Sequence, residues 1–531
     1  MSEPDELTIE SEIGRRSTLY DEIHYPGGVF PSTHPEHLAT IASLYGMEPV
    51  PVDRCRVLEL GCGFGANLLP MAYHYPQARF TGIDLSESSI ARGRENIAAL
   101  SLSNVELHHL DILDIGPEFG EFDYIISHGV YSWVPDTVRD KMLAIFKANL
   151  SPRGVCYVSY NAYPYSHARN VARDMVLFHT RGIVESRDKI AQARAILRFL
   201  SDASRADTVH GAMLREQYTR VSGMADEFFF HDDLNEIAQA FLLHQVAERA
   251  QSHGLQYLSD ADFARGCINR YPDGVRSVLQ GFPNEERVAR DQYQDFIDGF
   301  GFRRTLLCHD HVTLQRIVSR DFMRRCHFTG ASSPVRDQAD STSGSELQFG
   351  TRDQSVFGIS DEFVKAAFLQ LAAAWPRALA FDELLRATRA DLPTADESRS
   401  MDDDAKLLAG AMFNLACNDA ISFSLYPRGQ AANPDKPLAS PLARRQSETD
   451  TLVVNLLHQA VRLEDREACR ILQLLDGSRN LDQLAAEARA WRPRIHAERT
   501  DATTGNADAD AAGDAVRNFL IQARKLALLV G

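Results

Sequence analysis

The fold of this chain is decided by the stretch Val57-Leu58-Glu59-Leu60-Gly61-Cys62-Gly63-Phe64-Gly65. An apolar run ends at an acid, and three glycines alternate directly after it. This pattern predicts a buried strand that turns sharply into a helix, because side chains at the glycine positions would block both the turn and a close-lying ligand. Asp84 ends a second apolar run at the spacing where an acid binds ribose hydroxyls in nucleotide-binding folds. The sequence therefore predicts a site for a nucleoside-bearing cofactor.

The glycines alone leave two classes of cofactor open. Gly61, Gly63 and Ala66 also satisfy the dinucleotide fingerprint G-x-G-x-x-G/A. Further along, Asp111 follows a short third strand, and the stretch 122–127 predicts a fourth strand whose end opens onto the same site. These later residues favour a different nucleoside cofactor over NAD.

From Arg56 to Asn161 the sequence resembles the class I S-adenosylmethionine-dependent methyltransferases. In that family the glycine loop holds the methionine part, the acid after the second strand holds the ribose, and an Asp-Ile pair brackets the adenine. An acid at Glu59 suits this ligand, which carries an ammonium and a sulfonium and has no pyrophosphate to neutralise. The resemblance implies the following cofactor-binding residues: Glu59, Gly61, Cys62, Gly63, Gly65, Asn67, Asp84, Leu85, Asp111, Ile112, Ser127 and His128.

The segments 20–35 and 301–308 narrow the resemblance to a bacterial subgroup that carries a methyltransferase regulatory domain. Several protein-lysine methyltransferases are similar to this subgroup and end in winged-helix-like modules. We expect Tyr20 and Tyr25 to belong to a lid over the sulfonium, because an aromatic face attracts a cation. Ordinary packing of the N-terminal segment is the alternative.

Polar and aromatic residues follow the predicted fourth and fifth strands. The candidate catalytic residues are His128, Tyr131, Trp133, Tyr160 and Asn161. Methyl transfer to an amine depends on positioning and on a dry site, and burial lowers the pKa of a lysine. Asn161 would accept a hydrogen bond from the amine, His128 would act as a base or an orienting group, and the aromatic residues would line the channel. The alternative is that these aromatic residues pack beneath a helical insertion.

The whole chain predicts an α/β protein with a doubly wound, Rossmann-like, seven-stranded sheet. A terminal antiparallel hairpin is predicted from 302–307 and 311–317, joined by a turn at 308–310. The predicted domains are an N-terminal lid segment over 1–50, a methyltransferase core over 51–170 and 286–325, a helical regulatory or substrate-selecting insertion over 171–285, a linker over 326–352, and winged-helix-like modules over 353–440 and 441–531.

The composition of the chain favours some classes of partner and location over others. The formal net charge of −17 disfavours nucleic acid and favours a basic or neutral partner such as a lysine-bearing polypeptide. No long apolar run predicts a membrane span, and the polar, acidic N-terminus is unlike a signal peptide. The eight cysteines are scattered, which predicts a reducing, cytoplasmic location.

We expect no metal at Cys308-His309-Asp310-His311, since adjacent residues in one turn reach a single ion poorly.

These observations favour an S-adenosylmethionine-dependent methyltransferase that acts on a protein or peptide, at a lysine side-chain nitrogen. Two alternatives stay open. One is a small-molecule N- or O-methyltransferase of secondary metabolism, and the other is a non-catalytic, cofactor-sensing regulator. The sequence allows a homodimer and leaves the methyl acceptor unnamed.

Overall fold

The computed structural model describes residues 23, 25–330, 333–334, 346–350, 356–392, 400–427, 435–497 and 509–530. The chain divides into two compact units. The first contains the residues up to Gly28 together with Ile41–Ile268 and Asp273–Arg316. The second contains Val29–Thr40, Asn269–Pro272 and the chain from Ile317 onward. Tyr20 lies outside the described residues.

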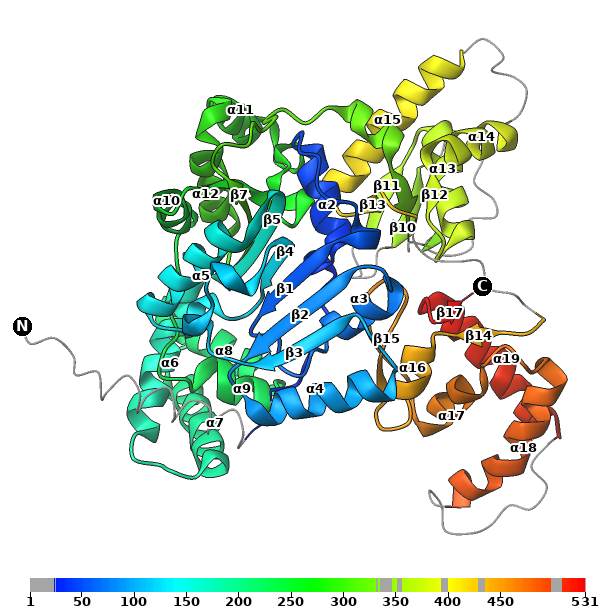
Figure 1. The fold of residues 1–531 in the computed structure, drawn as a ribbon, viewed down its shortest axis with the longest axis horizontal. Coiled ribbons are helices and arrows are strands. Elements are labelled where there is room, and N and C mark those ends of the chain that lie inside the picture. The colour runs from blue at the N-terminus through cyan, green and yellow to red at the C-terminus, as the bar shows by residue number, and fades with distance from the viewer. Residues whose placement is uncertain are drawn as a thin grey trace, which may run out of the picture. The chain divides into compact units, whose positions relative to one another are not determined.

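The first unit is built on a seven-stranded sheet with the strand order β3-β2-β1-β4-β5-β7-β6 (Figure 1). Strands β1 to β5 run parallel, and β7 runs antiparallel to both β5 and β6. The seven-stranded α/β sheet is therefore as predicted. The strands are β1 (Arg56–Leu60), β2 (Arg79–Asp84), β3 (Val105–His109), β4 (Phe122–Ser127), β5 (Leu150–Asn161), β6 (Leu255–Asp260) and β7 (Phe302–His309).

Helices cover both faces of this sheet. Leu58 and Leu60 share a core with residues of α5 and α10. Glu59 alternates with them and so faces the other side, where a side chain on its strand neighbour Gly82 would meet Leu68 of α3. The helices that contact the sheet include α3 (Leu68–His74), α4 (Glu87–Ala99), α5 (Asp136–Asn149) and α10 (Leu243–Ser252). Helix α12 (Arg287–Asp298) packs on α10, and α11 (Asp273–Gln280) precedes it in the chain. Helix α2 (Pro35–Leu44) crosses the boundary between the two units.

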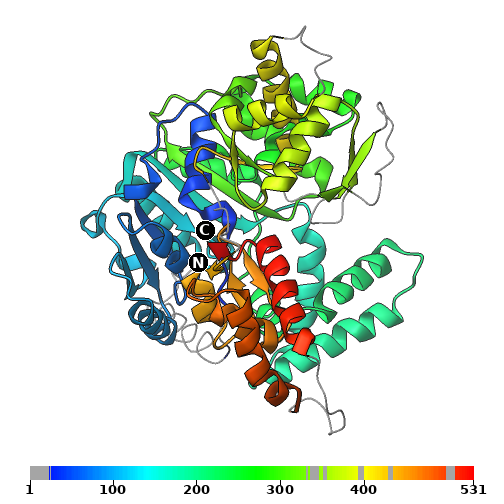
Figure 2. The same cartoon turned by 90° about the vertical axis from the view of Figure 1, so that its right-hand side faces the viewer.

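Four helices are inserted between β5 and α10, and Figure 2 shows the long ones as a bundle in teal and green. They are α6 (Ser166–Thr180), α7 (Ser186–Ala203), α8 (Val209–Ser222) and α9 (Asp226–Asp233). Val176, Leu197, Val221 and Phe229 form a separate buried core within them. The inserted helices therefore have a hydrophobic core of their own.

The predicted terminal hairpin is wrong in one strand. Residues 311–317 form no strand, and the place beside β7 is taken by β6, which the prediction had put inside the helical insertion. The 311–317 stretch is held by other contacts: the Gln315 N–H donates to the Tyr45 carbonyl at 2.8 Å, and the Arg316 guanidinium donates to the Leu258 carbonyl at 2.9 Å. One strand of the sheet, β6, therefore comes from the range 171–285 that was predicted to be a helical insertion.

The second unit contains two groups of elements. In the first group β8 pairs with β12 and β13, which places Phe328 between Leu379 and Phe423. Strands β8 and β10 fall in the range 326–352, so the linker prediction is wrong at these positions. The elements of this group are β8 (His327–Thr329), β9 (Ser333–Pro334), β10 (Leu347–Gly350), β11 (Val356–Ile359), α13 (Glu362–Ala374), β12 (Leu379–Ala380), α14 (Phe381–Asp391), α15 (Met401–Cys417) and β13 (Ser422–Ser424).

The second group is closed by the antiparallel pairing of β14 with β17 near the end of the chain. Its core includes Val453, Leu472, Leu484 and Val516. Its elements are β14 (Leu438–Ala439), α16 (Pro441–Gln446), β15 (Leu452–Val454), β16 (Ala460–Arg462), α17 (Arg466–Leu474), α18 (Leu481–Ala497), α19 (Ala509–Lys525) and β17 (Leu529–Val530). Across the described ranges, no helix combines the length and the apolar composition that crossing a membrane would require.

Candidate active site

The glycine loop after β1 has the backbone that its sequence predicts. Gly61, Gly63 and Gly65 have φ angles of +75°, +54° and +75°, in the left-handed region that side chains disfavour. A Cβ atom at Gly61 would come within 2.5 Å of a methyl carbon of Val130. At Gly63, by contrast, no described atom lies within 4 Å of the Cβ position. The loop is therefore packed at its first glycine and open at its second.

Asp84, at the end of β2, is joined to this loop by hydrogen bonds. Its Oδ2 accepts the Gly63 N–H at 2.7 Å, and its Oδ1 accepts the Ser86 N–H at 2.9 Å. Burial raises the pKa of the Asp84 carboxyl, and the two backbone donors act in the opposite direction. The acid is thus fixed in orientation beside the open side of the loop.

Glu59 is buried on β1 with one oxygen unsatisfied. Its Oε1 accepts a hydrogen bond from the Asn67 side-chain amide at 2.9 Å, whereas no described group bonds to its Oε2. Burial raises the pKa of Glu59 to about 8. A buried, unpaired carboxyl oxygen is costly unless a donor arrives with a ligand. The ammonium of a bound methionine group would be such a donor.

The remaining predicted cofactor residues lie at neighbouring strand ends. The Ser127 hydroxyl, at the end of β4, is buried and has no hydrogen-bond partner among the described residues. Asp111 begins a short helical turn and accepts the Leu113 N–H at 2.9 Å, with Ile112 as the next residue of that turn. These positions form a row along the carboxyl ends of the parallel strands, where ligands of open α/β sheets bind.

Cys62 and Leu85 are held mainly through their backbones. The Cys62 N–H donates to the Ile83 carbonyl at 2.9 Å, and the Cys62 side chain packs against Gly82, where a Cβ atom would lie 2.7 Å from its sulfur. The Leu85 carbonyl oxygen lies 3.0 Å from Nε2 of His109. Both residues follow strand ends that border the glycine loop.

The described part of the N-terminal segment lies against this loop. A Cβ atom at Gly27 would come within 2.5 Å of the Phe64 ring. Tyr25 packs edge-on against Phe228 and His231 of α9, with ring centroids 5.5 and 5.6 Å apart. The segment therefore reaches from the glycine loop to α9, and the lid role of Tyr25 stays a prediction.

His128, just after β4, is a neutral hydrogen-bonding group. Its Nδ1 lies 2.9 Å from the Tyr157 hydroxyl and 3.3 Å from Oγ of Ser159. Burial, and secondarily the charge of Arg304, lowers the pKa of His128 to about 3. An imidazole with this pKa is a poor proton acceptor at neutral pH, so the geometry favours the orienting role over the base.

Asn161 ends β5 with its backbone fixed on both sides. Its N–H donates to Oγ of Ser132 at 2.8 Å, and its carbonyl accepts the Phe241 N–H at 2.9 Å. Its half-buried side-chain amide makes no hydrogen bond within the described part of the chain. The amide is therefore positioned by the main chain and available to a substrate.

Tyr131 and Tyr160 lie in the hydrophobic core and do not line the candidate site. Both are buried in the core that contains α5 and α10, and the Tyr160 hydroxyl lies 2.9 Å from Oγ1 of Thr305. Successive side chains of a strand point to opposite faces, so Tyr160 faces away from Asn161. The Trp133 ring lies 5.8 Å below the Arg169 guanidinium of α6. The tyrosines thus match the packing alternative, and Trp133 contacts the insertion.

Tyr157 and Ser159 contact the candidate residue His128, and the sequence prediction did not include them. They share a face of β5 with Asn161, because the three positions are spaced by two residues. Ser159 also accepts the Gly129 N–H at 2.8 Å, which ties β5 to the loop after β4. The two-residue period of a strand, counted back from Asn161, is the sequence signal that identifies both residues.

Among the described residues, no group of three or more histidine, cysteine or acidic side chains is arranged to hold a metal ion. Cys308 and His309 are both buried in β7, where Nε2 of His309 lies 3.0 Å from the Leu150 carbonyl oxygen.

Three family models match parts of the chain. They are described as a methyltransferase domain (residues 51–197), a predicted methyltransferase regulatory domain (225–309) and the C-terminal winged helix domain of PKMT (435–528). The chain is 32% identical over 450 residues to the uncharacterized protein RP789 of Rickettsia prowazekii, an alignment that covers 83% of this chain and 80% of that protein. The structure of PKMT2 from Rickettsia typhi in complex with AdoHcy matches with a TM-score of 0.84 and 28% identity, over 96% of this chain and 100% of that one.

The chain belongs to the class I S-adenosylmethionine-dependent methyltransferases. The predicted enzyme class and the predicted cofactor are thereby confirmed. A further relative, the trans-aconitate 2-methyltransferase of Deinococcus radiodurans, is 33% identical over 107 residues, which cover 20% of this methyltransferase and 38% of the relative.

The site fits S-adenosylmethionine on its own geometry. The methyltransferase has an open glycine at Gly63, a fixed acid at Asp84, and buried oxygens on Glu59 and Ser127 that no described residue hydrogen-bonds. A ligand that carries a cationic amino group and ribose hydroxyls would satisfy these groups together.

Proposed function

We propose that this methyltransferase transfers the methyl group to the side-chain nitrogen of a lysine in a polypeptide. The observation that carries the proposal is the extent of the likeness to PKMT2, which covers 96% of this chain. The match to the PKMT winged helix domain, at residues 435–528, extends it to the C-terminal part. A relative that acts on a small molecule, the trans-aconitate methyltransferase, matches only 20% of the chain.

In this proposal the cofactor is held along the strand ends of β1 to β4. Glu59 and Ser127 would bind the amino acid part, the backbone of Gly61, Gly63 and Gly65 would border it, and Asp84 would accept hydrogen bonds from the ribose. Asp111 and Ile112 would flank the base, and Cys62, Asn67 and Leu85 shape the loop. S-adenosylmethionine supplies a methyl group that its sulfonium already activates.

The chain's own residues then prepare the lysine. The Asn161 amide oxygen accepts a hydrogen bond from the neutral amine and directs its lone pair toward the methyl carbon. Tyr157 and Ser159 hold His128, whose neutral imidazole adds no positive charge to the site. Desolvation of the lysine in this site lowers its pKa and so favours the neutral amine that the reaction needs. The hydrogen bond to Asn161 would hold the amine nitrogen for in-line attack, and the methylated amine would pass its extra proton to water.

A labelling experiment tests this function. The full chain is incubated with methyl-labelled S-adenosylmethionine and a bacterial extract, and macromolecules are separated from small products. We expect label in the protein fraction, removable by protease and resistant to nuclease, with the added mass on lysine. Label confined to small molecules would instead establish the metabolite methyltransferase, and the absence of any turnover would support a cofactor-sensing regulator.

Two further assignments accompany the proposal. All eight cysteines are buried and free of disulfides, which suits a reducing cytoplasm. The formal charge of −17 opposes binding to nucleic acid and suits a basic polypeptide. A homodimer stays compatible with these features, and sedimentation velocity measures it directly.

A further inference from the structure

Helix α12 has its polar and apolar faces reversed. Arg287, Asp291, Gln292, Gln294 and Asp295 are buried on it. Its large apolar residues are about half exposed: Tyr293 (52%), Phe296 (49%) and Ile297 (48%). A surface helix of a globular protein normally buries its apolar stripe and exposes its charges. Burial of an apolar stripe in the core therefore does not explain the orientation of α12.

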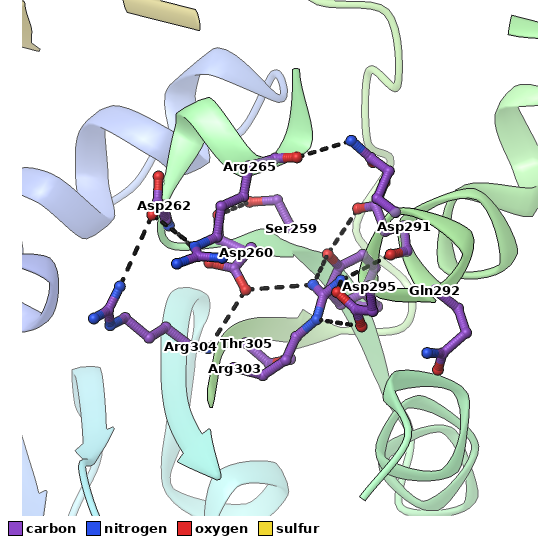
Figure 3. A network of polar contacts seen from close by, with 12 residues as sticks. Ser259, Asp260, Asp262, Arg265, Asp291, Gln292, Asp295, Arg303, Arg304 and Thr305 are labelled. Atoms are coloured by element: carbon purple, nitrogen blue, oxygen red, sulfur yellow. Dashed lines mark hydrogen bonds and ion pairs between the residues drawn. The ribbon is translucent and has the colours of Figure 1, made fainter. Parts of the chain in front are cut away.

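The buried face is explained by a charged network between α12, β6 and β7 (Figure 3). Arg303 donates to Asp295 at 2.6 and 2.9 Å and lies 3.3 Å from Asp260. Arg287 pairs with Asp291 at 2.8 Å. Buried charges are tolerated only when partners satisfy them. The network fixes the rotation of α12 and leaves its apolar residues in solvent.

The apolar face continues onto α11 and the loop between the two helices. The rings of Phe282 and Tyr293 lie 5.2 Å apart, those of Tyr293 and Phe296 lie 6.1 Å apart, and Val278 of α11 is 67% exposed. We call Val278, Phe282, Tyr293, Phe296 and Ile297 the α11–α12 surface. Contiguous exposed apolar groups of this kind mark sites of interaction.

The charges around the α11–α12 surface are acidic. Glu285, Glu286 and Asp298 are exposed on α12 and in the loop before it, and Asp273 of α11 is exposed in an ion pair. The neighbouring bases are already paired: Arg276 with Asp273, and Arg290 with Asp291. An apolar surface with an acidic rim complements a polypeptide that carries apolar and basic residues.

The α11–α12 surface is connected to the proposed lysine site. Helix α12 ends at Asp298 and is capped by Gly299. The two residues after the cap bind the chain just after Asn161: the Gly301 carbonyl accepts the Ala162 N–H at 2.9 Å, and the Phe300 carbonyl accepts the Tyr165 N–H at 3.4 Å. A polypeptide lying on α12 would therefore run toward the end of β5.

We propose that the α11–α12 surface docks a basic segment of the methyl-accepting polypeptide, through apolar side chains that flank its lysines. This inference rests on the proposed function and adds the chemistry by which the acceptor is recognised. Apolar anchors fill the aromatic surface, and neighbouring lysines face the acidic rim.

Binding of synthetic peptides tests the docking. The full chain, with S-adenosylhomocysteine present, is titrated into three fluorescein-labelled peptides of equal length: alternating Leu-Lys, alternating Ser-Lys and alternating Leu-Glu. We expect the Leu-Lys peptide to bind tightest by fluorescence anisotropy. The double variant Phe296→Gln/Ile297→Gln should raise its Kd by about tenfold or more, because aromatic anchors dominate such contacts.

Ile521→Gln is the matched control, since Ile521 is 55% exposed on a different helix, α19. Its Kd should equal that of the wild type. Thermal unfolding and cofactor binding of the double variant should also be unchanged, because its changes remove only exposed side chains. An unchanged Kd in the double variant, or equal binding of the Ser-Lys peptide, overturns the proposal.

Two further readouts separate the outcomes. If the double variant changes the sedimentation coefficient while peptide binding persists, the surface is an interface between two copies and the docking proposal fails. If the wild type methylates no polypeptide, the proposed function itself fails. If both proteins methylate polypeptides with the same KM, the docking alone is wrong.

Discussion

The backbone N–H of Gly63 donates a hydrogen bond to Oδ2 of Asp84 at 2.7 Å. The glycine belongs to the loop after β1 and the acid to the end of β2, so this bond joins the two strongest cofactor signals of the sequence into one unit. A change at either residue should therefore act on the same property, the affinity for the cofactor.

Replacement of Asp84 by alanine should weaken cofactor binding. The change removes the acceptor for Gly63 and Ser86 as well as the proposed ribose contact. A hydrogen bond to a charged group contributes about 1.5–3 kcal/mol, so a loss of about tenfold or more in affinity is expected by calorimetry. Asp53→Ala, at an exposed acid just before β1, is the control. Equal affinity of the two variants would remove Asp84 from the site.

Cofactor binding should release a proton through Glu59. Burial raises the pKa of this group to about 8 from its ordinary value of 4.5, so the free enzyme carries the proton at neutral pH. Between these two values the folded chain binds one proton more than the unfolded chain, and its free energy of unfolding falls as pH rises. An ammonium beside Glu59 favours the carboxylate, so affinity should rise with pH up to about 8.

Calorimetry in buffers of different ionisation enthalpy measures this proton. The wild type should release close to one proton per cofactor near neutral pH, and Glu59→Gln should release none. Equal proton release by both proteins would show that the Glu59 carboxyl does not ionise on binding.

The pH dependence of turnover should contain no limb from His128. Its pKa of about 3 keeps the imidazole neutral throughout the working range. His128→Gln should lower kcat by about tenfold, the effect of one lost hydrogen bond, and leave the shape of the pH profile unchanged. His210→Gln, at an exposed histidine of α8, is the control. A limb near pH 6.5 that disappears in His128→Gln would restore the base role.

Asn161→Ala should reduce kcat by about a hundredfold and leave the Kd for the cofactor unchanged, since positioned polar groups act mainly in the transition state. Asn161→Asp should also be slow at neutral pH, because an acid beside the amine keeps the lysine protonated. Asn170→Ala, which removes a 3.4 Å contact to the Tyr163 hydroxyl, is the control. Full activity of Asn161→Ala would assign the residue a structural role.

Loss of Arg303 should destabilise the fold. Arg303→Met leaves Asp260 and Asp295 buried without their guanidinium, which costs about 3–5 kcal/mol in comparable sites. The adjacent Arg304→Met should cost less than about 1 kcal/mol, because Arg304 is partly exposed and lies 3.9 Å from Asp262. Urea unfolding compares the two. Similar losses would mean that the network adds no specific stability.

Local signals in the sequence were sufficient to locate the cofactor loop, Asp84 and the end of β5. Gly61 and Gly63 report backbone conformations that side chains disfavour, and this is a property of a few consecutive residues. The register of the sheet is not local. Strand β6 is a short run between helices, whereas 311–317 alternates like a strand but pairs with no strand in the described ranges. Alternation reports an extended backbone, and only the three-dimensional pairing decides which extended segment enters the sheet.

Sequence composition also could not predict which aromatic side chains face the core and which residues face the site. Tyr160 and Asn161 are adjacent in sequence, yet the strand turns one into the core and the other toward the site. The composition of the segment suggested a channel, while the two-residue period of β5 assigned its members to different faces.

The pairing of β5 with β7 also sets an order of events during synthesis. β7 leaves the ribosome only after the insertion, α10, β6, α11 and α12 have been made. Until then the nascent sheet ends at β5, and an unpaired edge strand is a template for association with other chains. Translation that stops before Phe302 would release a fragment with the complete glycine loop and an open sheet edge. Such a fragment would be prone to aggregate rather than to act as a smaller enzyme.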